Sequence, residues 1–393
     1  MTLKSFLYLT QLEEYNVPRI KRWLAQNPHR EVKEIKQKLI WTTKIKFLNI
    51  IAKILFFLAP PVSISIGIYL LAPLDFILKY LIVLVAYIKL RIFHRRLTIV
   101  AITGSWGKTT TKDTLLDLIK SKYIAFATTA NHNTLLGVCQ DIISLPLNSQ
   151  FFIAEIGAYY SGDIRQVAKI LRPKYAIITA IGPMHLERFG TIEKIIDTKM
   201  ELPQTITQDG WIFIPDEIKQ KIFHIRLNSK NILFFNKIND VYQQITQLLN
   251  ISDYKNIVSS HPPSDHRLQI STNNGITIID DTYNSNPAGF ERALTKLAEY
   301  KSTNKILITP GMIELGNLQE MENTRLIKMA SKICQHIVVV GQTNKKSLLD
   351  GLRNTKSKIH LVNQTSDTLR LLPTITTNGA VVLFENDLPD HYL

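Results

Sequence analysis

The pattern of hydrophobic and polar positions changes at about residue 96 of this chain. Before that point, apolar residues run with few interruptions from Phe47 to Leu90. After it, short β-branched runs alternate with amphipathic segments, which is typical of an α/β fold with a mainly parallel sheet. We predict strands at 97–102, 151–156, 176–180, 276–280, 306–309, 337–340 and 380–384.

The apolar run from residue 47 to residue 90 predicts membrane attachment. A helix needs roughly 20 apolar residues to cross a bilayer, so two helices fit if the chain turns near Pro73–Asp75. Lys53 and Lys79 interrupt the run and are costly in lipid unless their side chains reach the surface. The expected structure is a membrane hairpin; a re-entrant hairpin and a pair of core helices remain the alternatives.

The charge of the chain supports a membrane surface as partner. The net charge is +15, and residues 1–96 hold 16 Lys and Arg against 5 Asp and Glu, which leaves only +4 for the remainder. Basic residues flank the apolar run on both sides, so the positive-inside rule places both ends in the cytoplasm. We therefore expect membrane lipids and no nucleic acid as partners, and a location at the cytoplasmic face of the cell membrane.

The length of 393 residues allows two or three domains. We expect a basic N-terminal region at 1–96 with the hairpin at about 47–90, a central ATP-binding domain at 97–262 and a Rossmann-like C-terminal domain at 263–393. The polar segment 259–265 is the predicted linker. Cys139 and Cys334 lie far apart, so neither a disulfide framework nor a zinc site is indicated.

The segment from Val100 to Thr111 has the composition of a nucleotide phosphate loop. An apolar strand ends in Thr-Gly-Ser-Trp-Gly-Lys-Thr-Thr and is followed by a predicted helix. Gly104 and Gly107 allow close approach of the backbone to phosphate, Lys108 supplies a positive charge, and the Thr109 hydroxyl suits Mg²⁺. The alternative is an ordinary glycine turn between a strand and a helix.

Three further polar residues follow predicted strands or lie beside them. Glu155 ends the apolar run 151–154, where a carboxylate can reach a Mg²⁺ ion beside the phosphate loop. His185 lies in a short loop after the strand 176–180, and Lys199 lies in a helical segment. Spacing alone leaves His185 as a metal or phosphate contact or a surface histidine, and Lys199 as an ordinary helix lysine.

The ordered set of motifs resembles the ATP-dependent Mur ligase family of amide-bond-forming enzymes, most of all its members that add D-alanyl-D-alanine. The motifs are Thr103–Thr110, Thr129–Gly137, Glu155–Ala158 with Gly162–Ile164, His185–Gly190, Asp280–Pro287 and Gly311–Gly316. They stand in the family's order over residues 97 to about 345. The resemblance implies that ATP phosphorylates an acceptor carboxylate and that an amine then attacks the acyl-phosphate.

The resemblance also implies roles for individual residues. ATP and its phosphates would contact Gly104, Ser105, Gly107, Lys108, Thr109, Thr110, Arg267, Asp281 and Asn286, with Tyr283 and Asn284 nearby. Mg²⁺ would bind Thr109 and Glu155, and His185 would hold a second ion. Lys199 matches the family lysine that is often carbamylated, and the acceptor would meet Asn131, Asn133 and Thr134.

Several departures from the family pattern leave the substrates open. The family's N-terminal UDP-sugar domain is not recognisable, and neither is the C-terminal Lys-Gly-Ser motif. The acceptor is therefore expected to be a muramoyl-peptide-like or lipid-linked precursor, and the donor an amino acid or dipeptide amine. The alternatives are a membrane-attached P-loop ATPase or kinase, a family ligase with a non-wall acceptor, and a scaffold with a degenerate ligase fold.

Overall fold

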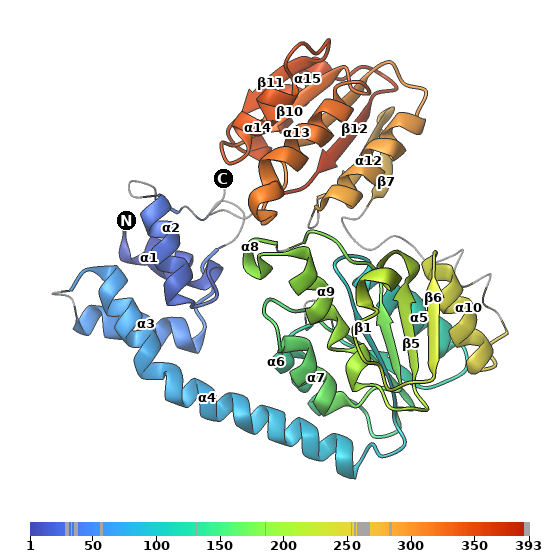
Figure 1. The fold of residues 1–393 in the computed structure, drawn as a ribbon. Helices are drawn as coiled ribbons and strands as arrows, with labels where there is room; N and C mark the ends of the chain where they lie inside the picture. Colours follow the sequence, from blue (N-terminus) through green and yellow to red (C-terminus); the bar gives the residue numbers. More distant parts are fainter. Residues whose placement is uncertain are drawn as a thin grey trace.

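The computed structural model describes residues 1–27, 31–32, 34, 38–55, 58–129, 132–184, 186–252, 254, 257, 268–282 and 285–388. Within this part the chain forms two six-stranded sheets, preceded by helices (Figure 1). The N-terminal helices are α1 (Leu3–Leu12), α2 (Val17–Gln26), α3 (Thr43–Ile54) and α4 (Pro60–Ile92).

The first sheet carries the phosphate loop. Its strands run in the order β2-β3-β1-β4-β5-β6, and all neighbouring pairs are parallel. The strands are β1 (Thr98–Thr103), β2 (Ala125–Ala127), β3 (Phe151–Glu155), β4 (Tyr175–Ile178), β5 (Trp211–Pro215) and β6 (Asn231–Phe235). The helices are α5 (Lys108–Lys120), α6 (Leu135–Ser144), α7 (Asp163–Leu171), α8 (Leu186–Phe189), α9 (Ile192–Met200) and α10 (Ile238–Leu248), with 3₁₀ turns η1 (Pro203–Thr205) and η2 (Asp216–Ile222).

Both faces of this sheet are covered, as an apolar parallel sheet requires. Helices α6, α7 and α9, with the last turns of α4, pack on one face. Helices α5 and α10 pack on the other. The carboxyl ends of β1, β3 and β4 therefore meet at one edge, where a ligand can approach the loops that follow them.

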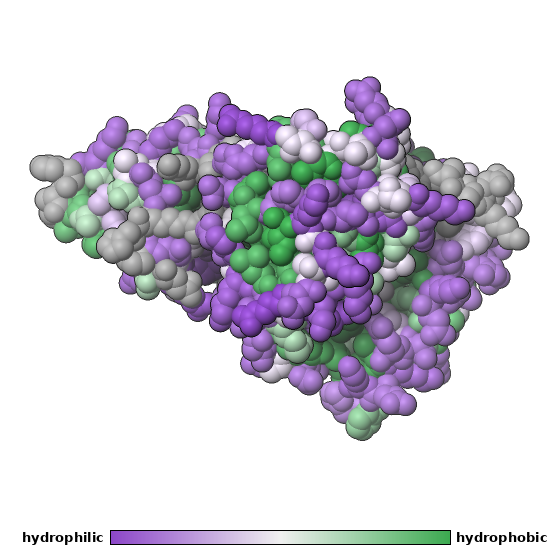
Figure 2. All heavy atoms as spheres, turned by 90° about the horizontal axis from the view of Figure 1, so that it is seen from above, coloured by the Kyte–Doolittle hydropathy of each residue, from purple (hydrophilic) through white to green (hydrophobic). Residues whose placement is uncertain are grey.

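The second sheet has the order β11-β10-β9-β12-β8-β7, and β7 is its antiparallel edge strand. The strands are β7 (Gln269–Asn273), β8 (Ile276–Asp281), β9 (Lys305–Thr309), β10 (His336–Val340), β11 (Lys358–Val362) and β12 (Val381–Glu385). The helices are α12 (Pro287–Glu299), α13 (Gln319–Ala330), α14 (Lys345–Gly351) and α15 (Thr368–Ile375), with η3 (Gly316–Leu318) and η4 (Thr365–Asp367). Seen from above, the surface here is mostly hydrophilic around hydrophobic patches (Figure 2).

The expected turn at Pro73–Asp75 is wrong. Helix α4 continues through Pro73, and the chain instead turns between α3 and α4, which pack against each other. Proline is tolerated here, although it removes one backbone hydrogen bond. Asp75 forms an ion pair with Lys44 of α3. Among the described residues, α4 is the single helix long and apolar enough to cross a membrane, with a mean hydropathy of 2.1.

Candidate nucleotide and magnesium site

The loop between β1 and α5 is shaped by two glycines. Gly107 has a φ of +79°, a left-handed conformation that favours glycine, and it immediately precedes the first residue of α5. A Cβ atom on Gly104 would lie 2.1 Å from Oγ1 of Thr179. The loop thus passes too close to the segment after β4 for a larger residue at position 104. The N-terminus of α5 follows the loop directly, and backbone amides at a helix N-terminus bind anions such as phosphate.

Lys108 and Ser105 are both held by hydrogen bonds to backbone groups. The Nζ atom of Lys108 donates to the carbonyl of Gly104 at 3.0 Å. The Ser105 hydroxyl donates to the carbonyl of Gly182 at 3.1 Å and accepts from the Gly182 amide at 3.0 Å. The Ser105 amide donates to Ala180. Ser105 therefore fixes the loop against the segment after β4, while Thr110 follows in the first turn of α5.

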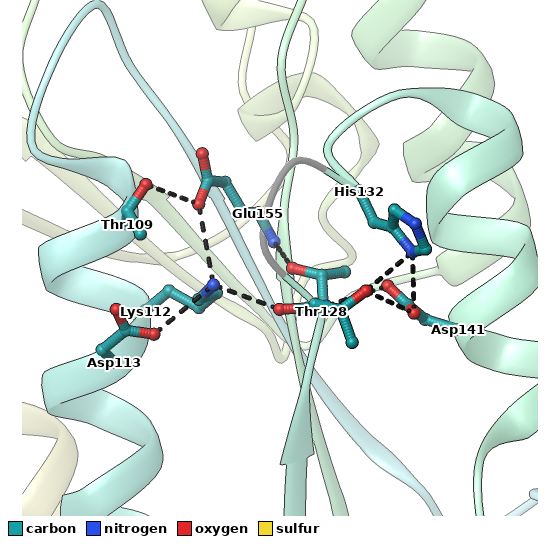
Figure 3. Close-up of polar contacts among 8 residues, drawn as sticks. Thr109, Lys112, Asp113, Thr128, His132, Asp141 and Glu155 are labelled. Carbon is teal, nitrogen blue, oxygen red and sulfur yellow. Dashed lines mark hydrogen bonds and ion pairs between the residues drawn. The ribbon is translucent and has the colours of Figure 1, made fainter. Parts of the chain in front are cut away.

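Thr109 and Glu155 meet at the carboxyl end of the sheet (Figure 3). The Thr109 hydroxyl donates to Oε2 of Glu155 at 2.9 Å. Glu155 ends β3 and is only 8 % exposed. A hydroxyl and a carboxylate are hard oxygen ligands of the kind Mg²⁺ takes beside phosphates, so these two residues fit such an ion. Sequence analysis predicted both residues, and the structure brings them together.

Lys112 is a site residue that sequence analysis missed. It lies one turn after Thr109 on α5 and is 5 % exposed. Its Nζ atom lies 4.0 Å from Oε2 of Glu155 and 3.1 Å from the carbonyl oxygen of Thr128, to which it donates. The i, i+3 spacing from Thr109 is the signal that places it on the same face of the helix.

The segment after β2 is held by a second polar network (Figure 3). The Thr128 hydroxyl accepts from the Glu155 amide at 3.0 Å. Thr129 donates from its hydroxyl to Asp141 at 3.0 Å, and Nδ1 of His132 lies 3.0 Å from the same carboxylate oxygen. These contacts orient the segment that leads to the predicted acceptor residues.

Of those acceptor residues, Asn133 and Thr134 are described. The Asn133 carbonyl accepts from the amide of Gly157 at 2.7 Å, directly after β3. Thr134 is exposed and occupies the N-cap of α6 without a side-chain cap bond. Asn133 therefore lies beside the strand end that carries Glu155.

Lys199 is buried beside the phosphate loop. It is 5 % exposed, in the last turn of α9. The pKa of Lys199 is lowered to about 7, mainly by burial and then by the positive charge of Lys108. The carboxylates of Asp163 and Glu201 raise this pKa, but their effect is smaller. At neutral pH a large share of this side chain is therefore an uncharged amine, which an ordinary helix lysine is not.

The predicted residues of the second sheet lie at the end of β8. Asp281 is 7 % exposed and accepts from the Leu268 amide at 3.0 Å. The Asn286 side chain accepts from the Gly289 amide at 3.0 Å and so caps α12. Glu385, opposite Asp281 on β12, is fully buried, and burial followed by the Asp281 carboxylate raises its pKa well above the ordinary value.

The other predicted site residues lie outside the described residues. They are Asn131, His185, Arg267, Tyr283 and Asn284, together with the linker 259–265. No group of three or more His, Cys, Asp or Glu side chains suited to a metal occurs within the described ranges. The candidate magnesium site is of another kind, in which phosphate and water complete the oxygen ligands.

The fold and the site together define a P-loop α/β protein with a second, Rossmann-like unit. Two family models match consecutive parts of the chain: the Mur ligase middle domain over residues 102–274, and the Mur ligase glutamate ligase domain over residues 266–385. The chain belongs to the Mur ligase family. This confirms the family resemblance and the α/β fold class that the motifs predicted.

Similar curated proteins carry the name UDP-N-acetylmuramoyl-tripeptide–D-alanyl-D-alanine ligase. The protein from Mycobacterium bovis is 26 % identical over 298 residues, covering 62 % of this chain and 58 % of the relative. The protein from Rickettsia prowazekii is 27 % identical over 308 residues, covering 66 % and 68 %. The chain thus spans 58 % of the length of the first of these relatives.

Solved structures of MurF share the fold. MurF from Thermotoga maritima, in complex with ADP, superposes with a TM-score of 0.69 at 23 % identity, covering 79 % of this chain and 80 % of that one. MurF from Acinetobacter baumannii gives a TM-score of 0.68 at 22 % identity, covering 79 % and 77 %.

Proposed function

We propose that this protein is an ATP-dependent amide ligase that joins an amine to a carboxylate of a peptidoglycan-type precursor. The observation that carries the proposal is the 2.9 Å contact between the Thr109 hydroxyl and Glu155, beside a glycine-shaped phosphate loop. That arrangement matches the requirement of phosphoryl transfer for positioned phosphates and a metal ligand pair. Family membership supports ligation as the use of this site.

The proposed reaction has two steps. An oxygen of the acceptor carboxylate attacks the γ-phosphorus of ATP, and ADP leaves. The amine nitrogen then attacks the carbonyl carbon of the acyl-phosphate, inorganic phosphate leaves, and the amine loses a proton. Lys108 neutralises charge on the transferred phosphoryl group, and Thr109 with Glu155 holds the Mg²⁺ ion that supplies further charge neutralisation.

The remaining residues take supporting roles in this proposal. Gly104, Ser105, Gly107 and Thr110 shape the phosphate loop, while Arg267, Asp281 and Asn286 approach the nucleotide when the units close. Asn131, Asn133 and Thr134 would bind the acceptor, and His185 would hold a second Mg²⁺ ion. We assign residues 97–262 to the ATP-binding domain and 263–393 to the closing domain.

Lys199 is proposed to carry a carbamate. A neutral amine attacks CO₂, forms a carbon–nitrogen bond and releases one proton, which leaves a carboxylate-like anion. The pKa of about 7 supports this, because the neutral amine is abundant at physiological pH. The anion would offset the charge of nearby Lys108 and support the second metal.

For the substrates we propose a muramoyl peptide as acceptor and D-Ala-D-Ala as amine donor, the pair that the names of the relatives contain. The acceptor is linked to UDP or to a lipid. A family ligase with a non-wall acceptor is the second candidate, because the chain spans little more than half of the Mycobacterium bovis relative. We further propose attachment to the cytoplasmic face of the membrane through residues 1–96.

The test is ADP release by the full-length protein in detergent with Mg²⁺, ATP, D-Ala-D-Ala, and UDP-linked or lipid-linked muramoyl peptides. Lys108→Ala is compared with Lys120→Ala, an exposed lysine at the other end of α5. Turnover that requires acceptor and is lost only in Lys108→Ala supports the ligase. Turnover indifferent to acceptor indicates an ATPase or kinase, and no turnover in the wild-type protein contradicts catalysis and favours a scaffold.

A further inference from the structure

Helix α4 exposes a continuous apolar strip along most of its length. Leu70, Leu74, Ile77, Leu81, Leu84 and Ile88 are 37–65 % exposed, and we call these six residues the α4 strip. At about 100° per residue they fall within an arc of about 80°, and the strip is about 27 Å long. Soluble proteins rarely expose so large a contiguous apolar surface without a partner.

The opposite side of α4 contacts the protein at both ends of the helix. Asp75, the single acidic residue of the helix, pairs with Lys44 of α3. Ala86 and Leu90 are buried in the core of the first sheet unit. At the N-terminal end, Ile64 packs into the core formed by α1 to α3. Both ends of α4 are therefore docked, and Figure 1 shows the two docked parts on the same side of the helix.

This docking excludes a bilayer crossing in the described conformation. Between Gly67 and Ala86, which are both buried, lie eighteen residues of α4 that are not buried. They span roughly 27 Å, whereas the hydrocarbon core of a bilayer is about 30 Å thick, so a crossing would draw the docked protein into the hydrocarbon. A helix lying in the plane of the membrane needs only its outer side free, and that is what the α4 strip provides.

The residues beside the strip favour lipid over a second copy of the chain. The strip has the 4-3-4-3 spacing of a coiled-coil seam, so a helical dimer is the rival occupant. Coiled coils in water carry charged residues next to the seam, but here those positions hold Leu78, Tyr80, Val85 and Tyr87, all exposed. A wide apolar face with tyrosines at its edge is typical of an interfacial helix.

A basic cavity lies where α4 ends. It has a volume of about 260 Å³ and is lined by Arg91, His94, Arg95 and Arg172 together with apolar side chains. His94 is 6 % exposed, and neither of its ring nitrogens has a hydrogen-bond partner of good geometry. The Nε atom of Arg91 is likewise buried and unpartnered. Among the residues lining the cavity none is acidic.

The cavity adjoins the C-terminal end of the strip. The guanidinium of Arg91 lies 5.1 Å from the ring centroid of Tyr87, which borders the strip one turn earlier. Buried donors without partners are costly, and a bound anion with several oxygens would satisfy them. A phospholipid would fit both features, because its acyl chains suit the α4 strip and its headgroup phosphate suits the basic cavity.

We propose that α4 lies flat in the surface of an anionic bilayer, with the α4 strip among the acyl chains and a lipid headgroup phosphate in the Arg91–His94–Arg95–Arg172 cavity. This deepens the membrane attachment proposed above. It does not depend on the ligase activity, because the assays below contain no nucleotide, acceptor or amine.

The first test is co-sedimentation of the full-length protein with phosphatidylglycerol vesicles and with phosphatidylcholine vesicles. We expect at least tenfold stronger binding to phosphatidylglycerol. Leu81→Glu should lower binding at least tenfold, whereas Leu369→Glu, the same change at a 70 % exposed leucine of α15, should leave it unchanged. Equal loss in both variants, or sedimentation of a dimer in place of vesicle binding, overturns the proposal.

The second test isolates the cavity. Arg172→Gln should lower binding to phosphatidylglycerol severalfold, while Arg353→Gln, at an exposed arginine of the second sheet unit, should not. Inorganic phosphate should compete more strongly than chloride at equal ionic strength. If phosphate and chloride compete equally at the same ionic strength, or if the two variants have equal effects, the cavity binds no headgroup phosphate. Either result overturns the cavity part of the proposal.

The third test distinguishes lying from crossing. A fluorophore is attached to cysteine in Leu70→Cys, Ile77→Cys or Ile88→Cys; Cys139 and Cys334 are buried. Quenching by lipids brominated at different depths should place all three probes at one shallow depth. A deep probe at position 77 between shallow probes at 70 and 88 would show a crossing helix.

Discussion

The candidate magnesium site is centred on Oε2 of Glu155. The Thr109 hydroxyl lies 2.9 Å from this oxygen, and Nζ of Lys112 lies 4.0 Å from it. We expect Thr109→Val to lower acceptor-dependent ADP release by roughly 10²-fold, since valine keeps the shape but removes the metal-ligating hydroxyl. Thr109→Ser should keep most activity and serve as the matched control. Equal rates for Val and Ser would contradict a role for the hydroxyl.

The buried amine of Lys199 predicts a pH-dependent stability. Its pKa falls from 10.5 in the unfolded chain to about 7 in the fold, so between these values the unfolded state binds more protons. Below pH 7 the buried amine is charged in the folded state, and its burial destabilises the fold by the full amount. Above pH 7 the folded amine loses its proton, so this destabilisation decreases as the pH rises. The stability of the wild type relative to Lys199→Met should increase by up to about 1.4 kcal/mol per pH unit between pH 7 and pH 10.

Urea unfolding in CO₂-depleted buffer, with a probe in the first sheet unit, measures this difference. A flat difference across the range would mean that Lys199 stays charged in the folded protein, and the proposed carbamate would then lose its physical basis. Adding bicarbonate should stabilise the wild type but not Lys199→Met, because CO₂ then binds the folded state alone.

At the scale of the elements, sequence patterns predicted seven of the twelve strands in the described part of the chain. The seven predicted strands correspond to β1, β3, β4, β8, β9, β10 and β12. The edge strands β7 and β11 were missed because one face meets solvent and carries polar residues, as in Gln269–Asn273. Strands β2, β5 and β6 of the first sheet were missed as well. The turn near Pro73 was misplaced because proline and aspartate are common in turns. In the structure Asp75 lies within α4 and pairs with Lys44 of α3, a tertiary contact that the local sequence does not reveal.

The candidate site shows a similar division. Glycine spacing predicted the phosphate loop, and the polar residue ending a strand predicted Glu155. Lys112 was not predicted, because its partners Thr128 and Glu155 come from other elements of the sheet. The motif Thr129–Gly137 was recognised, but the hydrogen bonds of Thr129 and His132 with Asp141 were not predicted. The i, i+3 spacing places Lys112 on the helix face of Thr109, but it does not show that this face is buried beside a carboxylate.

The phosphate loop packs tightly against the segment after β4. A Cβ atom on Gly182 would lie 2.2 Å from the Trp106 ring. Gly182→Ala should therefore destabilise the protein by about 1–3 kcal/mol, as overpacking does. Adding Trp106→Ala removes the clash, so the double variant should be more stable than the sum of the two single changes. Additive effects in thermal unfolding would contradict direct contact.

At the scale of the whole molecule, three parts of the chain meet around Arg188 of α8. Its guanidinium lies 3.2 Å from Glu314 of the second sheet unit and 4.3 Å from the ring centroid of Tyr159. The N-terminal helices reach the same place, since the positive charge of Arg188 helps to lower the pKa of Glu13 against the larger effect of burial. Glu314 itself has a left-handed φ of 62°, a conformation that costs a non-glycine residue energy and needs such support.

We expect Arg188→Ala to loosen the second sheet unit from the first, because it removes the ion pair between Arg188 and the half-buried Glu314 carboxylate at the joint. Small-angle scattering should show a larger radius of gyration, and ATP affinity should fall if closure completes the nucleotide site. Arg22→Ala is the control, because Arg22 lies 3.9 Å from Glu187 at an exposed position and such pairs contribute little. If Arg188→Ala and Arg22→Ala scatter identically, the Arg188 contacts do not hold the parts together, and closure must depend on the nucleotide alone.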